Sequence, residues 1–278
     1  MRIVKFNHLY LVLIFLTVIS CNRQIKKIEY YAFSGKVDSN RAEEIFKTKS
    51  GLYKVEIYDT SGNLIRENGF DYEMNEDNVI ERKYDENHNL VEVLTYKRYS
   101  NQVLSKTYLW KYIYKDNLLV EILSYYGTLD SSGFWARNTF IYNNKKQKIK
   151  EEFISYNDEA IKETRLYDWK DEFSYVEDRI DKEGILAERH FVRLDKNGKE
   201  IEHRINFGVN SKDDNSYQVY FENSYDEYGN VLINKSKYVG SSEQKLEYKY
   251  LYVRKNWNYR LQNSDNNYST EFRKIVYY

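Results

Sequence analysis

The sequence predicts an all-β fold, an antiparallel meander of consecutive hairpins that forms an open, twisted sheet. Two observations lead to this prediction. The chain of 278 residues contains 30 Tyr and no Pro, and Tyr is enriched in strands whereas Pro removes a donor from the strand ladder. A short turn motif also recurs between runs in which apolar and polar residues alternate, which is the pattern of a half-buried strand.

The first 20 residues have the composition of a signal peptide. Arg2 and Lys5 precede an apolar run, LYLVLIFLTVI, at residues 9–19. This run is too short to cross a bilayer comfortably and suits the apolar core of a signal peptide. It ends in VISC, so that the only cysteine, Cys21, follows a small residue. We therefore assign residues 1–20 to a signal peptide.

The VISC segment resembles the lipobox of bacterial lipoproteins, with Val18 three residues before Cys21 and the small Ser20 directly before it. The resemblance implies cleavage before Cys21, attachment of a diacylglycerol to its sulfur and acylation of the new N-terminus. Each buried methylene of an acyl chain contributes about 0.8 kcal/mol, so three chains anchor a protein firmly. We expect the membrane to be a partner through this lipid anchor, with residues 21–36 forming the tether and the first strand.

The residues after Cys21, NRQIKK, are basic. Lipoproteins that Bacteroidetes send to the cell surface usually carry acidic residues at this place. We therefore expect a protein of the cell envelope, anchored in the outer membrane of a Gram-negative bacterium with its body facing the periplasm. Exposure at the cell surface stays open as the alternative.

One short helix is predicted before the sheet begins. Asn40 can cap its N-terminus, Ile45 belongs to its apolar face, and Gly51 follows its end, where glycine is the favoured residue. We place this helix over residues 40–49. After Gly51 the spacing of apolar residues changes to every second position, which predicts strands.

The recurring turn is a corner of the form Tyr-Asp-x-x-Gly-Asn, followed by an aliphatic pair. Asp and Asn hydrogen-bond their own turn, and Gly adopts a positive φ without strain, so each corner predicts the tip of a hairpin. Most intervals between complete and degraded copies are roughly 25–31 residues, as a strand–turn–strand unit requires. The copies begin at Tyr58, Tyr84, Tyr114, Tyr142, Asp181, Leu194 and Tyr225.

This set of corners resembles the YD repeats of the RHS superfamily. It is more similar still to the small Bacteroidetes lipoproteins that carry a few divergent copies and end in a GNW corner and an R-x-I-x-Y strand. Here the chain ends in RKNWN and RKIVYY, so its final corner lacks the Gly. The resemblance implies one YD-like hairpin repeat domain over residues 37–278. About eight corners are too few to enclose a folded domain as large RHS proteins do, which favours an open sheet.

Two tyrosine stripes and one loop are the candidate binding surfaces. Aromatic residues at alternate positions of a strand share one face. Cross-strand packing explains such stripes, and the functional alternative is a flat aromatic platform for sugar rings or a partner protein. The loop GTLDSSGFW adds an aromatic pair that we expect to be exposed. The candidate residues are Tyr108, Trp110, Tyr112, Tyr114, Tyr248, Tyr250 and Tyr252 in the stripes, with Phe134 and Trp135 in the loop.

The sequence contains no recognised catalytic motif. It lacks G-x-S-x-G, H-E-x-x-H and P-loop patterns. His190 and His203 flank one corner and could approach each other across a hairpin, but two imidazoles without a third ligand do not form a metal site. We predict no catalytic residue, no metal and no cofactor. The 43 basic and 43 acidic residues balance, which gives no bulk attraction to nucleic acid.

These observations predict a lipid-anchored repeat protein of the cell envelope that acts as a non-catalytic binding or scaffold module for a protein or glycan partner. Two alternatives stay open. The first is an immunity or antitoxin-like protein that binds a partner toxin, because YD-like repeats accompany toxins. The second is an envelope enzyme acting on glycans, because the abundant carboxylates could supply a glycosidase-like pair.

Overall fold

The protein consists of β-strands over most of the chain that the computed structural model describes. The described residues are 24–34, 44–45, 47–98, 104–127, 133–156, 161–207, 218–227, 230–238, 244–253, 256–264 and 267–277. The predicted signal peptide and Cys21 lie outside them. The strands are β1 (Ile25–Ser34), β2 (Leu52–Tyr58), β3 (Leu64–Phe70), β4 (Glu76–Tyr84), β5 (Leu90–Lys97), β6 (Ser105–Lys115), β7 (Leu118–Tyr126), β8 (Phe134–Tyr142), β9 (Lys148–Ser155), β10 (Lys162–Trp169), β11 (Ser174–Ile180), β12 (Leu186–Leu194), β13 (Glu200–Phe207), β14 (Gln218–Tyr225), β15 (Val231–Tyr238), β16 (Gln244–Val253), β17 (Asn256–Ser264) and β18 (Asn267–Tyr277).

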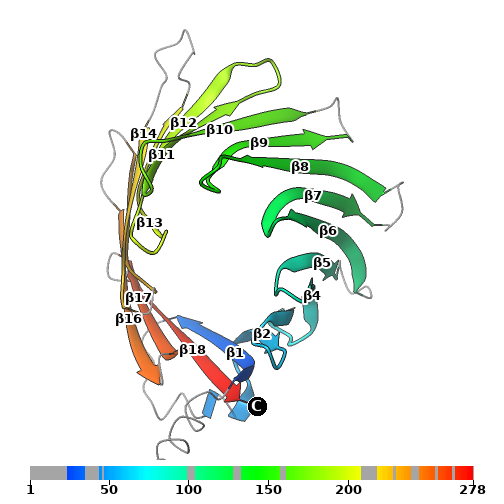
Figure 1. The fold of residues 1–278 in the computed structure, drawn as a ribbon. Helices are drawn as coiled ribbons and strands as arrows, with labels where there is room; N and C mark the ends of the chain where they lie inside the picture. The colour runs from blue at the N-terminus through cyan, green and yellow to red at the C-terminus, as the bar shows by residue number, and fades with distance from the viewer. Residues whose placement is uncertain are drawn as a thin grey trace, which may run out of the picture.

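Every strand is antiparallel to the strand that precedes it and to the strand that follows it. The predicted all-β meander of consecutive hairpins is confirmed. β1 also pairs with β18, with Ile28 opposite Glu56 on one side and opposite Ile275 on the other. The strands therefore follow one another around a ring, which Figure 1 shows end-on.

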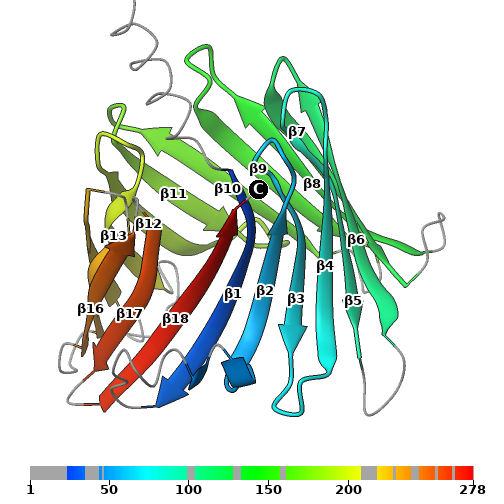
Figure 2. The same cartoon turned by 90° about the horizontal axis from the view of Figure 1, so that it is seen from below.

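The pairing of β1 with β18 brings the first and last strands of the meander side by side. Unpaired N–H and C=O groups of an edge strand are a liability, and here the first and last strands of the meander satisfy each other (Figure 2). Local sequence patterns identify hairpins between neighbouring strands. They carry no information about two strands at opposite ends of the chain.

The repeated corners gather at one end of the ring, which we call the corner end. At Asp85 the side-chain Oδ1 accepts hydrogen bonds from the backbone N–H groups of Asn87 and Asn89 at 2.9 and 2.8 Å. The backbone N–H of Asp85 donates to the carbonyl of Asn89 at 2.9 Å. The same arrangement holds the corners that begin at Asp59, Asn143 and Asp195. An Asp or Asn at the first position is therefore what closes the turn.

Degraded corners keep this turn without the glycine. His88 and Lys146 have φ values of 63° and 62°, at the position where Gly62 and Gly198 in the better copies have φ values of 88° and 77°. Such a conformation is costly for a residue with a Cβ atom. The hydrogen bonds to the leading Asp or Asn hold it in place, which explains why the loss of glycine in the middle of the chain does not remove the hairpins.

A β-bulge follows the corners, and its extra residue is aliphatic. Tyr58 stands opposite Leu64 while Ile57 stands opposite Arg66, so that Ile65 is the extra residue. The register shifts in the same way at five later corners, always at the residue that begins the corner motif. A bulge bends the strand and increases its twist. The repeated motif thus encodes a turn and a bend together.

The tyrosine before a corner forms a hydrogen bond to the previous hairpin. The hydroxyl of Tyr84 donates to the carbonyl of Leu64, which opens the strand after the preceding corner, at 2.9 Å. At the corner without a clear motif the indole Nε1 of Trp169 takes this role and donates to the carbonyl of Lys148. The other pairs of this kind are Tyr142 with Leu119 and Tyr225 with Glu200.

Two corners lie at the opposite end of the ring, which we call the loop end. Asp181–Ile185, which the sequence analysis counted as a degraded copy, joins β11 to β12 there, and Asp71–Asn75 joins β3 to β4. The second of these was missed because no tyrosine precedes it and no aliphatic pair follows it. The Asp-based turn therefore serves both ends, whereas the complete motif marks the corner end.

The faces of the sheet are defined by the helical segment. Residues 44–45 and 47–48 are helical, within the predicted helix at 40–49, and Ile45 packs against Tyr31, Leu52 and Val55. Figures 1 and 2 place this segment outside the ring, so the face with Tyr31 is the outer face and the face with Tyr30 is the inner face. Among the described residues, no helix is long and apolar enough to span a bilayer.

We expect the Tyr84→Phe substitution to lower the free energy of unfolding by about 1 kcal/mol, because the carbonyl of Leu64 loses its hydrogen-bond donor. Urea-induced unfolding measures the change. Tyr72→Phe is the matched control, since the Tyr72 side chain is 94% exposed. Equal effects of the two substitutions would contradict a structural role for the tyrosine before the corner.

Candidate functional site

Aromatic side chains gather where β6, β7, β8 and β9 reach the loop end. We call this group the aromatic rim. It consists of two groups, and within each group the centroids of neighbouring rings are 5.1–5.5 Å apart. Trp110, Tyr108 and Tyr126 form the group on the inner face. Tyr125, Phe134 and Tyr156 form the other, with Tyr125 paired to Phe134 on the outer face. Tyr126 is 54% exposed and Tyr156 is 51% exposed, so the rim presents ring surface to solvent. Its members are Tyr108, Trp110, Tyr125, Tyr126, Phe134 and Tyr156.

The predicted stripe on β6 lies on one face of its strand. The registers place Tyr108, Trp110 and Tyr112 on the inner face, opposite Tyr126, Ser124 and Ile122 of β7. The side chains of Tyr108, Trp110, Tyr112 and Tyr114 in β6 are half-buried. Burial raises the pKa of Tyr112 and of Tyr114. Cross-strand packing therefore accounts for much of the stripe. Only its loop-end half, Tyr108 and Trp110, joins the aromatic rim.

Phe134 and Trp135, at the start of β8, contact different neighbours. Phe134 packs between Tyr125 and Tyr156 in the aromatic rim, whereas Trp135 packs edge-on against Phe153 with the ring centroids 6.3 Å apart. Both are half-buried, so the expectation of an exposed aromatic pair is corrected: a bulge at this point turns the two rings toward different neighbours. The buried indole Nε1 of Trp135 has no hydrogen-bond partner.

The second predicted stripe lies in β16. The backbone of this strand pairs with β15 and β17. The side chains of Tyr248, Tyr250 and Tyr252 lie outside the part of the chain that the structure describes, and so does Cys21. Their predicted roles stay predictions.

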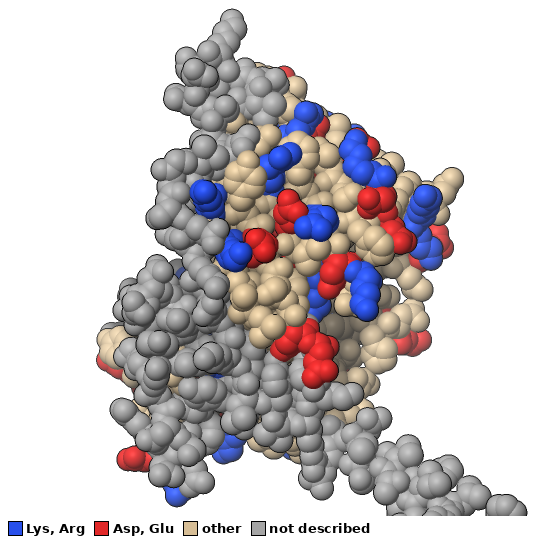
Figure 3. Space-filling view, turned by 90° about the vertical axis from the view of Figure 1, so that its left-hand side faces the viewer, with Lys and Arg blue, Asp and Glu red and all other residues tan. Residues whose placement is uncertain are grey.

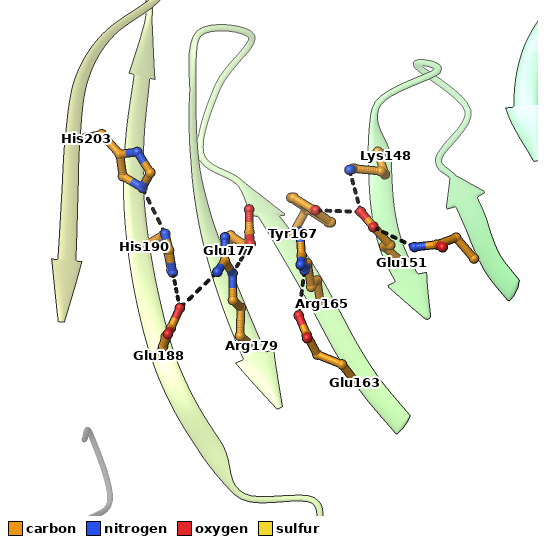
Figure 4. Close-up of polar contacts among 11 residues, drawn as sticks. Lys148, Glu151, Glu163, Arg165, Tyr167, Glu177, Arg179, Glu188, His190 and His203 are labelled. Atoms are coloured by element: carbon orange, nitrogen blue, oxygen red, sulfur yellow. Dashed lines mark hydrogen bonds and ion pairs between the residues drawn. The ribbon is translucent and has the colours of Figure 1, made fainter. Parts of the chain in front are cut away.

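Charged side chains form a second group on the inner face of β9 to β13, which we call the charge ladder (Figure 4). The registers from β1 onward place it on the same face as Tyr30. Apart from His190 and His203, its members could not be identified from the sequence, because they are spread over several strands and none belongs to a motif. They are Lys148, Glu151, Glu163, Arg165, Tyr167, Glu177, Arg179, Glu188, His190 and His203.

Glu151 is the best-satisfied carboxylate at the β9 end of the charge ladder. It accepts hydrogen bonds from Lys148 Nζ at 2.8 Å and from the Tyr167 hydroxyl at 3.1 Å. Burial alone would raise the pKa of Glu151, but Lys148, the nearby Arg165 and Tyr167 outweigh it and hold the pKa below its usual value. Burial and the neighbouring Glu177 and Glu151 carboxylates raise the pKa of Tyr167. Glu151 is thus ionised and Tyr167 neutral near pH 7.

The middle of the charge ladder consists of ion pairs. Arg165 Nε lies 2.8 Å from Glu163, and Arg179 bridges Glu177 at 2.7 Å and Glu188 at 3.0 Å. Glu177 is only 8% exposed. A buried charge requires a partner, and these groups supply partners to one another. Their three carboxylates and two guanidinium groups leave one negative charge in excess on the inner face of β10 to β12.

Two histidines end the charge ladder. His190 Nδ1 lies 2.8 Å from His203 Nε2, so the two rings do meet across the β12–β13 hairpin. His190 Nε2 lies 2.8 Å from Glu188, and His203 Nδ1 lies 3.2 Å from Glu200. His190 is 2% exposed, and burial lowers its pKa. Among the described residues, no three His, Cys, Asp or Glu side chains are placed to hold a metal ion.

The sheet from β12 to β15 carries a groove of about 700 Å³. Arg193 pairs with Glu202 at 2.8 Å and Lys235 with Glu222 at 3.4 Å within it. Figure 3 shows that basic and acidic side chains alternate over this side of the molecule. The groove therefore presents no surface of a single charge.

Comparisons with known proteins identify no family. No protein-family model and no curated protein matches the chain. Among solved structures, a porin-like protein from Bacteroides uniformis is similar with a TM-score of 0.44 and 11% identity, covering 91% of this chain and 96% of that one. A porin-like protein from Bacteroides vulgatus has a TM-score of 0.36 and 10% identity, with 72% and 94% covered. The TcdB2–TccC3 structure has a TM-score of 0.28 and 8% identity, with 85% and 18% covered. These values carry no conclusion about function.

We expect Glu151→Gln to lower the free energy of unfolding at pH 7 by about 1–3 kcal/mol, because Lys148 and Tyr167 lose an ionised partner. The folded pKa of Glu151 lies below its unfolded value, so the wild-type advantage is present above pH 4.5 and is lost as the pH falls through the folded pKa. Urea unfolding at pH 7 and pH 4 measures this. The exposed Glu172→Gln is the control, and a difference between wild type and Glu151→Gln that does not shrink on acidification would contradict the assignment.

Proposed function

We propose that the protein is a lipid-anchored, non-catalytic binding module of the cell envelope, and that its aromatic rim contacts a protein or glycan partner. The observation that carries the proposal is the exposure of the rim: Tyr126 and Tyr156 present about half of their surface at one end of the ring. Tyrosine combines a large contact area with a polar tip and loses little conformational freedom on binding. These are the properties of residues that dominate interfaces.

The charged groups of the inner face support this choice. The carboxylates and guanidinium groups described above pair with one another, so their interactions are already engaged within the sheet. Placing a ligand on them would require breaking those pairs. The aromatic rim needs no such rearrangement, because its exposed rings contact solvent.

The lipid anchor would orient the ring. Cys21 precedes Ile25, the first residue of β1, by four residues, a reach of about 14 Å at most. β1 starts at the corner end, since Lys27 stands opposite Ile57, just before the first corner. β6 has 11 residues, so at about 3.3 Å per residue the rim lies roughly 30 Å from the corners. The anchor would hold the corner end at the membrane and the rim away from it.

Replacement of the lipidated residue tests the anchor. We expect Cys21→Ser to move the protein from the membrane fraction to the soluble fraction, because a serine hydroxyl cannot form the thioether. Globomycin, which blocks lipoprotein signal peptidase, should leave a larger, unprocessed form of the wild-type protein. Fractionation and intact-mass measurement give the result. Unchanged mass and unchanged fractionation would remove the anchor from the proposal.

Site-specific photocrosslinking in the native envelope tests the rim. With benzoylphenylalanine in place of Tyr126 or Tyr156, we expect an adduct on irradiation, because the proposal puts these rings at the partner. Glu86, exposed at the corner end, is the matched control and should give none. Mass spectrometry of the adduct distinguishes a protein partner from a glycan. Absence of an adduct at both rim positions, or an adduct at Glu86 alone, would contradict the proposed surface.

A further inference from the structure

We propose that His190 and His203 form a proton-binding site, in which one proton is shared between the two rings and the pair carries a single positive charge at neutral pH. Three short contacts in a row carry the inference. They run from Glu200 to His203, from His203 to His190 and from His190 to Glu188, and Figure 4 shows the last two. Each contact needs one proton between its two atoms.

The two outer contacts place a proton on each ring. A carboxylate is an acceptor only, and Glu188 Oε2 already accepts from Arg179 Nη1 at 3.0 Å. His190 Nε2, 2.8 Å from the same oxygen, must therefore carry hydrogen. By the same reasoning His203 Nδ1 donates to Glu200 Oε1. These two protons are all that a pair of neutral imidazoles can hold.

The central contact requires a third proton. With both rings neutral, His190 Nδ1 and His203 Nε2 would each carry a lone pair, and two lone pairs would face each other at 2.8 Å. An N–H···N hydrogen bond of this length forms only when one of the two nitrogens is protonated. Three protons on two rings make one imidazolium shared by the pair. The geometry thus fixes the charge of the site at one.

The surroundings balance that charge. The groups that face His190 are Glu177 and Arg179 from β11, Glu188 from β12 and His203 from β13. Glu177 and Glu188 supply two negative charges, and Arg179 supplies one positive charge. The shared proton supplies the second positive charge, so the charges that face His190 sum to zero. Glu200, the partner of His203, lies outside this set. Because buried charges need partners, a proton-free pair would leave a carboxylate without compensation.

The site responds to acidification. A second added proton would put two N–H groups face to face at 2.8 Å and break the link between β12 and β13. The two histidines of the unfolded chain titrate near pH 6.5, so below that pH they bind more than one proton between them, while the folded pair keeps only the proton that it shares. Stability therefore falls as the pH decreases below about 6.5.

NMR of the folded protein with ¹⁵N-labelled histidine tests the proton count directly. At pH 7 we expect three of the four ring nitrogens of His190 and His203 to be protonated, with a ¹⁵N–¹⁵N coupling between His190 Nδ1 and His203 Nε2. Two protonated nitrogens, or no coupling between the rings, would overturn the proposal. This outcome comes from the wild-type protein and does not depend on whether a variant folds.

Substitutions of His203 distinguish a shared proton from simple packing of the two rings. In His203→Gln, the amide N–H can still donate to His190 Nδ1 but carries no charge, so the coupling and the extra proton should disappear while the protein stays folded. His203→Phe removes the donor as well and should unfold at a lower urea concentration than His203→Gln. His88→Gln, at an exposed corner, should leave the coupling intact. Persistence of the extra proton in His203→Gln would also overturn the proposal.

Discussion

The unbroken ladder of backbone hydrogen bonds around the ring is the constraint on which the rest of the structure depends. Each strand has a partner on both sides, including β1 and β18, so every side chain is placed by two registers at once. A shift of one residue at any strand would move its whole set of inward-facing residues to the outer face. The alternation of the faces is therefore fixed all the way around, and the charge ladder follows from it.

The corner motif supplies the regularity that this ladder needs. Its Asp or Asn closes the turn, its aliphatic pair contains the bulge that bends the strand, and its tyrosine reaches the preceding hairpin. Three local interactions are thus encoded in eight consecutive residues, and each acts on a different scale. The turn sets the hairpin, the bulge sets the curvature, and the tyrosine sets the spacing of one hairpin from the next. Each copy of the unit therefore adds a local bend and twist to its strand.

The two ends and the two faces of the ring carry different kinds of side chain. Compact turns occupy the corner end, and half-exposed aromatic rings occupy the loop end between β6 and β9. The inner face from β9 to β13 is polar and its charges are internally paired, since each described acid there has a basic or hydroxyl partner. The shared proton of His190 and His203 has the same effect, because it offsets the charge of the carboxylates that face His190.

The sequence by itself determined the strands, the hairpin tips, the helical segment and the alternation of faces, because turns and strand periodicity depend on residues close together in the chain. It also indicated that His190 and His203 could meet across one hairpin. The tertiary structure alone decided that β1 pairs with β18, that Phe134 and Trp135 separate, and that acids and bases of five strands align into the charge ladder. These outcomes depend on registers between strands and on bulges, where a single inserted residue changes the neighbour of every side chain beyond it.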